Sequence, residues 1–157
     1  MSQIIQQRDS ILSADFVSPK YCTALQLLGV TNEGPYFFSE EDKETTDGCI
    51  ITHYELLSFA FDKDYYYQQC WYNQATTPGI KPKNIIHTYS TAQLFNALPP
   101  LLHEYKATGH SVMLDKHYGI ESQSPRLPDA LAIALEQCIR KRLLTVDYIN
   151  RALLFKQ

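Results

Sequence analysis

Residues 124–139 read Ser-Pro-Arg-Leu-Pro-Asp-Ala-Leu-Ala-Ile-Ala-Leu-Glu-Gln-Cys-Ile, and this stretch decides the fold. At helical spacing its apolar side chains form one stripe, which consists of Leu127, Leu131, Ala134, Leu135, Cys138 and Ile139. The polar side chains Asp129, Glu136 and Arg140 fall on the opposite side, where we expect solvent. Pro125 and Pro128 are compatible with the first turn only. The pattern therefore predicts a helix that packs its apolar stripe against the core.

Length and composition indicate a soluble globular protein with one domain. The chain has 157 residues, of which 45% are hydrophobic and 20% charged, and its formal net charge is −3. A domain of this size buries a full core without disulfides, and so small a net charge does not indicate a polyanion or a membrane as partner. The N-terminus lacks the apolar core of a signal peptide, and no apolar run approaches the roughly 18 residues of a membrane span. We expect a cytoplasmic protein with reduced thiols.

Local signals predict the remaining elements. Residues 1–17 have weak periodicity and are expected to be a loosely ordered lead-in to a single domain over 18–157. The further elements expected from turn, cap and alternation signals are a helix over 19–28, a short aromatic strand over 36–38, a solvated loop over 40–48, strand content with an irregular connection over 49–72, a loop over 76–84, a helix beginning at Thr91, a short turn over 101–105, a hairpin pairing 112–114 with 118–120, and a last helix after Thr145. Together they predict an α+β fold with three to four helices packed on a small, mostly antiparallel sheet.

Four cysteines are the first candidates for chemistry. Cys22, Cys49, Cys70 and Cys138 are widely spaced and form no C-x-x-C pair. The spacing gives no reason to expect a metal or another cofactor. Cys49 or Cys70 with His53 or His87 is the combination that a thiol enzyme would need, but nothing in the sequence aligns them, and core packing is the favoured interpretation.

A second group contains imidazoles. His103, His110 and His117, with Asp115 beside the last, form the densest histidine region of the chain. A metal or acid–base site is one interpretation, and surface or turn histidines are the favoured one. Asp115 suits a turn because its carboxylate bonds its own backbone.

Aromatic residues crowd into the segment 54–72, whose candidate contact residues are Tyr65, Tyr67, Trp71 and Tyr72. Aromatic side chains stack on single-stranded nucleic acid, but the segment has Asp62 and Asp64 against Lys63 alone, so a core or a protein interface is favoured.

The C-terminal part contains the one locally basic patch, which consists of Arg140, Lys141, Arg142, Arg151 and Lys156. The turn at Leu144-Thr145 gives it a weak likeness to a helix-turn-helix, although the first three cations suit the end of the preceding helix. Ile133 breaks the polar side of the 127–139 helix and is either a partner contact or packed on the last helix.

The order of features resembles small uncharacterised proteins of bacteriophages, prophages and other mobile elements. The segments that carry the resemblance are 25–30 with 36–38, then 91–99, then 127–132. The resemblance implies an α+β fold and no activity or site. The sequence thus predicts a non-enzymatic accessory or protein-interaction protein, with a small Cys/His enzyme and a nucleic-acid-binding protein as alternatives.

Overall fold

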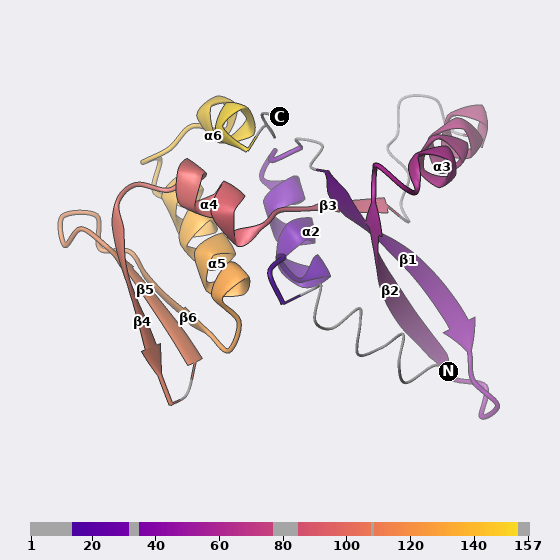
Figure 1. Ribbon diagram of the computed structural model, residues 1–157, viewed down its shortest axis with the longest axis horizontal. Coiled ribbons are helices and arrows are strands. Elements are labelled where there is room, and N and C mark those ends of the chain that lie inside the picture. Colours follow the sequence, from indigo (N-terminus) through magenta and orange to yellow (C-terminus); the bar gives the residue numbers. More distant parts are fainter. Residues whose placement is uncertain (1–13, 32–34, 77–84, 108, 154–157) are drawn as a thin grey trace.

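The computed structural model describes residues 14–31, 35–76, 85–107 and 109–153, and for residues 70–76 it describes the backbone alone. Within these ranges the chain forms five helices and two three-stranded antiparallel sheets. The predicted α+β class is confirmed, although two sheets take the place of one. Figure 1 shows the sheets at opposite sides of the molecule, with α2 and α5 between them.

The helices are α2 (Pro19–Leu27), α3 (Lys63–Thr76), α4 (Thr91–Ala97), α5 (Leu127–Arg140) and α6 (Val146–Ala152). One sheet has the order β2-β1-β3 and consists of β1 (Tyr36–Glu44), β2 (Ile50–Ser58) and β3 (Ile85–Thr88). The other has the order β4-β5-β6 and consists of β4 (Leu101–Lys106), β5 (Gly109–Leu114) and β6 (Glu121–Ser124).

Helix α5 is the centre of the core, as its apolar stripe predicts. Leu131, Ala134 and Leu135 are completely buried, and the helix packs on β5, β6, α2 and α4. Its opposite side differs from the prediction at Asp129, whose residue surface is only 4% exposed. The reason lies in α2, because the N-terminus of that helix covers the first turn of α5 and supplies hydrogen-bond donors to the carboxylate.

The neighbouring residues Phe37 and Phe38 of β1 are buried in two different hydrophobic clusters. Phe38 faces the main core around α5, while Phe37 faces a smaller cluster with Ile85 of β3 and Tyr66 of α3. Adjacent strand residues point to opposite faces, so both sides of this sheet are covered near Phe37 and Phe38. Helix α3 covers one side and the α2–α5 layer the other.

Three predictions for connecting segments are wrong, and in each case pairing with the next strand along the chain decides the structure. Residues 40–44, expected in a solvated loop, continue β1 because β2 pairs with it along its whole length. Residues 101–105, expected as a turn, form β4 against β5. The expected pairing of Leu114 with Tyr118 and Val112 with Ile120 does not occur, since Val112 lies opposite Ser122. The segment 49–72 contains strand β2 as expected, but its second half is α3.

Local capping signals give the correct helix ends. The capping box at Ser90 and Gln93 is complete, and Thr145 accepts a hydrogen bond from the amide of Tyr148. Of the predicted N-terminal lead-in, residues 1–13 lie outside the described residues. Its last part is packed, because Phe16 and Val17 are buried and Phe16 bridges to Ser90.

Candidate interaction surface

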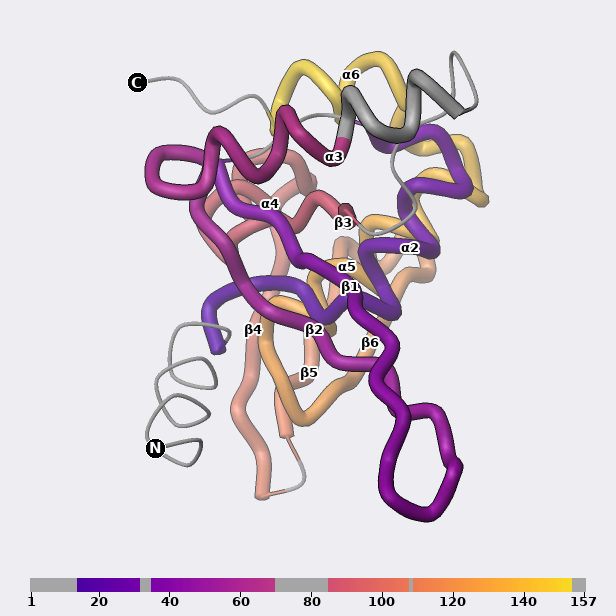
Figure 2. Tube along the Cα trace, turned by 90° about the vertical axis from the view of Figure 1, so that its right-hand side faces the viewer, coloured from indigo at the N-terminus to yellow at the C-terminus, as the bar shows by residue number. Residues whose placement is uncertain are grey.

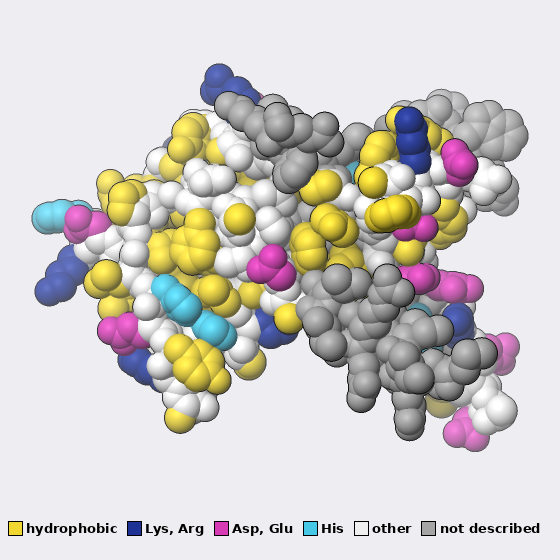
Figure 3. Space-filling view, viewed as in Figure 1, with side chains coloured by type: hydrophobic (Ala, Val, Ile, Leu, Met, Phe, Trp, Pro, Cys, Tyr) yellow, Lys and Arg dark blue, Asp and Glu magenta, His cyan; other side chains and the backbone are white. Residues whose placement is uncertain are grey.

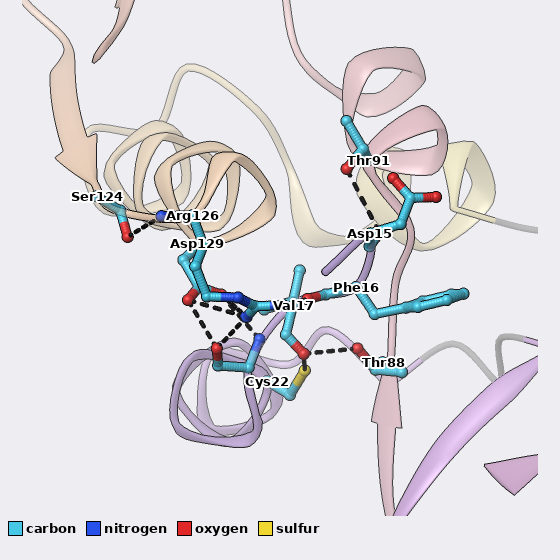
Figure 4. A network of polar contacts seen from close by, with 10 residues as sticks. Asp15, Phe16, Val17, Cys22, Thr88, Thr91, Ser124, Arg126 and Asp129 are labelled. Carbon is cyan, nitrogen blue, oxygen red and sulfur yellow. Dashed lines mark hydrogen bonds and ion pairs between the residues drawn. The ribbon is translucent and has the colours of Figure 1, made fainter. Parts of the chain in front are cut away.

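A buried polar network joins the first described residues to α5 (Figure 4). The Asp129 carboxylate accepts hydrogen bonds from the backbone amide of Ser18 at 2.8 Å and from its hydroxyl at 2.7 Å. Arg126 pairs with the same carboxylate at 3.2 Å, also donates to the Ser18 hydroxyl, and donates to the carbonyl of Phe16 at 2.9 Å. Both carboxylate oxygens therefore accept hydrogen bonds within the fold. The network fixes the N-terminus of α2 and does not offer a binding site to a ligand.

Of the three cysteine side chains that the structure describes, Cys22 and Cys138 are buried. Burial raises the pKa of the Cys22 thiol to about 12 and that of Cys138 to about 11. Cys22 donates to the carbonyl of Val17, as Thr88 does. A thiol with so high a pKa supplies almost no thiolate at neutral pH. The prediction that Cys49 packs in the core is wrong, because Cys49 is exposed at the turn before β2. The side chain of Cys70 lies outside the described part.

The aromatic segment is divided between core and surface. Tyr66 is buried, and Tyr65 is half-buried with its hydroxyl 2.8 Å from the Ser39 hydroxyl. Tyr67 is exposed and meets the rings of Phe59 and Tyr66 edge to face. The backbones of Trp71 and Tyr72 continue α3, and nothing is described of their side chains. Of the four aromatic residues predicted as contacts, Tyr67 is the one whose described side chain is exposed.

The hairpin of β1 and β2, here called the arm, extends beyond both cores (Figure 2). Its outer strand β2 pairs with β1 through nine residues, and among the described residues no strand pairs with the other edge of β2. Three of its large side chains are exposed, namely Ile50 at 73%, Ile51 at 46% and Tyr54 at 47%. A long exposed edge with apolar side chains is the feature that binds a further strand in many proteins.

The arm is also strongly acidic. Residues 40–55 contain one lysine, Lys43, and six carboxylates, namely Glu40, Glu41, Asp42, Glu44, Asp47 and Glu55. Acidic side chains gather over this part of the molecule at the lower right of Figure 3. Burial together with the charges of Glu40 and Asp42 raises the pKa of Tyr54. The net charge of this segment is −5 against −3 for the whole chain, so the rest of the protein is slightly positive.

A local sequence signal encodes the turn of the arm. Asp47-Gly48 stands between two strands, and Gly48 has a φ of +81°. The amide of Gly48 donates to the carbonyl of Thr45, whose own amide donates to the carbonyl of Cys49 at 2.8 Å. An Asp-Gly pair flanked by strand-forming residues is a strong hairpin signal. The acidic run before it hid the strand, because polar residues on both faces give no alternation.

The basic C-terminal patch is only partly free. Arg140 pairs with Glu136 at 3.1 Å, and Lys141 donates to the carbonyl of Gly119 at 2.9 Å. Arg151 is exposed and donates to the carbonyl of Asp147, while Lys156 lies outside the described residues. Ile133 is half-buried on α5. Surface ion pairs of this kind contribute little to stability.

The second sheet carries two further features, one towards each end of β4 and β5. His103 and His110 lie side by side on β4 and β5. In the turn after β5, the backbone amide of His117 donates to the Asp115 carboxylate at 3.1 Å, so Asp115 bonds its own turn as predicted. A mainly apolar hollow of about 580 Å³ lies at the other end of the same strands and is lined by Pro100, Leu101, Leu102, Met113, Leu114, Asp115, Lys116 and Tyr118.

Comparisons with family models, with curated proteins and with solved structures found no significant match. No helix in the described ranges has the length and hydropathy to cross a membrane. Those ranges also contain no group of three or more His, Cys, Asp or Glu side chains arranged to hold a metal ion. The interpretation of function therefore depends on the surface of this chain alone.

Proposed function

We propose that this protein is a non-enzymatic interaction protein whose arm binds a basic, extended segment of a partner protein along the edge of β2. The observation that carries the proposal is the coincidence of an edge strand, exposed apolar side chains and a net charge of −5 in one hairpin. The unpaired edge supplies backbone hydrogen bonds, and alternate side chains of the arm supply specificity. The carboxylates of the arm, most of which lie on the neighbouring strand β1, attract lysine and arginine and raise the rate of encounter.

The arm is suited to this task because its base is anchored. Phe37 and Phe38 fix β1 in two cores, and β3 pairs with the base of β1 but not with its outer half. The free edge of β2 can then accept a strand without any change in the core. A cytoplasmic location, predicted from the N-terminal sequence and the cysteines, is consistent with such an accessory role and stays a prediction. The same holds for an origin in a phage or another mobile element, which the sequence resemblance implies.

The test uses a synthetic octapeptide of alternating lysine and valine, with a glutamate–valine octapeptide as its control. We expect the lysine peptide to shift backbone amide signals of residues 50–58 and to bind more weakly as salt is raised towards about 1 M, where the Debye length is about 3 Å. The glutamate peptide should not bind.

Charge variants separate the arm from the rest of the surface. Glu40→Lys with Asp42→Lys should weaken binding at least tenfold, whereas Glu121→Lys with Asp147→Lys, which changes the net charge equally at exposed positions elsewhere, should weaken it much less. Equal losses for the two double variants, or shifts confined to other strands, would contradict the proposal. Circular dichroism of each variant checks that the fold is retained.

A further inference from the structure

His103 and His110 form a close imidazole pair on β4 and β5, near the end of these strands where Lys106 pairs with Gly109. The Nε2 atom of His103 lies 2.9 Å from the Nδ1 atom of His110. The ring planes are inclined by only 18° and the ring centroids are 5.1 Å apart. Since the centroids are much further apart than the two nitrogens, the rings meet edge to edge, with one nitrogen of each directed at the other.

The two strands hold this pair in place. His103 lies opposite Val112, and His110 lies opposite Tyr105, so both histidines and Tyr105 occupy one face of the β4–β5 ladder. The Tyr105 ring meets the His110 ring edge to face at 4.8 Å. Histidine side chains lie beside exposed hydrophobic ones at the lower left of Figure 3. His103 is exposed, so the pair is open to solvent.

The separation of the two nitrogens fits a shared metal ion. Two nitrogen ligands at about 2.0–2.1 Å from a metal and at right angles lie about 2.9 Å apart, and this square-planar or tetragonal geometry is the one that Cu²⁺ and Ni²⁺ prefer. We propose that His103 and His110 are the two protein ligands of a surface site for Cu²⁺, whose other positions are filled by water or by a bound partner. Each ring must turn about its Cβ–Cγ bond to direct its lone pair at the ion, and this torsion is soft for histidine.

The pair can bind a metal ion without a net loss of protons. In the free pair one ring carries its hydrogen on the nitrogen that faces the other ring. On metal binding that hydrogen moves by exchange with water to the second nitrogen of the same ring, so no net proton is lost. Partial burial and the neighbouring His103 lower the pKa of His110, which favours the neutral ligand form at neutral pH.

The experiment measures Cu²⁺ binding to the full chain without an affinity tag, by titration calorimetry and electron paramagnetic resonance. We expect one site whose spectrum shows two nitrogen ligands. Substoichiometric Cu²⁺ should broaden the amide signals of residues 101–105 and 109–112 before all others. His103→Gln and His110→Gln should each weaken binding by more than the roughly 10–100-fold cost of losing an outer-shell partner, and the double variant should lose little more than either.

His117→Gln is the matched control, because His117 is an exposed histidine in the turn after β5. It should bind Cu²⁺ as the unchanged protein does. Unchanged affinity in the His103→Gln and His110→Gln double variant, a spectrum with one nitrogen ligand, or broadening that begins elsewhere would each overturn the proposal. The broadening experiment uses the unchanged protein and stays decisive if a variant fails to fold.

Discussion

Replacing Asp129 by alanine tests whether the buried network between α2 and α5 stabilises the fold. The carboxylate accepts the Ser18 amide and hydroxyl and pairs with Arg126, and its side chain is 6% exposed. The substitution leaves the amide without its acceptor and the guanidinium without its counterion. Removing one partner of a buried ion pair costs about 3–5 kcal/mol, and a hydrogen bond to a charged group is worth about 1.5–3 kcal/mol.

The Arg126 side chain is 31% exposed, so solvent compensates part of the loss. We therefore expect Asp129→Ala to lower the free energy of unfolding by about 3 kcal/mol, which corresponds to about 6–12 °C in Tm for a domain of this length. Urea denaturation followed by circular dichroism measures the change, and an unaltered m value shows that the unfolded state is the same.

Glu136→Ala is the matched control, because it removes a carboxylate from the same helix that pairs with Arg140 at the surface. Its cost should be about 0.3–0.5 kcal/mol. In a double-mutant cycle, Arg126→Ala and Asp129→Ala should be non-additive by about 1 kcal/mol or more. If Asp129→Ala costs no more than Glu136→Ala, the reasoning about this network is refuted.

Two further predictions concern the stability of glycine variants and the dependence of stability on pH. Gly109 has a φ of +135°, and an added Cβ would lie 2.7 Å from the carbonyl oxygen of Ser124. In urea denaturation, Gly109→Ala should therefore lower the free energy of unfolding by about 1–3 kcal/mol. Gly48→Ala, whose Cβ has no atom within 4 Å, should lower it less. Because burial raises the Cys22 pKa from 9.0 to about 12, the unfolded state ionises first, and the free energy of unfolding should fall by up to about 1.4 kcal/mol per pH unit between pH 9 and 12. Cys22→Ala should reduce that slope; an unchanged slope would show that the thiol is not its source.

Only part of the candidate surface can be predicted from the sequence. The sequence predicts that the aromatic segment 54–72 forms core or interface, but which ring is buried depends on how α3 lies on β1, and the sequence does not specify that arrangement. Tyr66 is buried and Tyr67 exposed, although they are neighbours of the same type. The edge of β2 was missed because its strand partner, the acidic run from Glu40 to Glu44, lacks the apolar alternation by which strands are recognised.

The sequence by itself determined the helices whose signals lie within one or two turns. The stripe from Leu127 to Ile139, the capping box at Ser90 and the cap at Thr145 predicted α5, α4 and α6, because caps and helical periodicity depend on residues a few positions apart. Only the tertiary structure decided that Asp129 is buried, that residues 101–106 form a strand and that His103 meets His110. In each case the partner is distant along the chain or on another strand, and neither propensity nor periodicity specifies which segments pair.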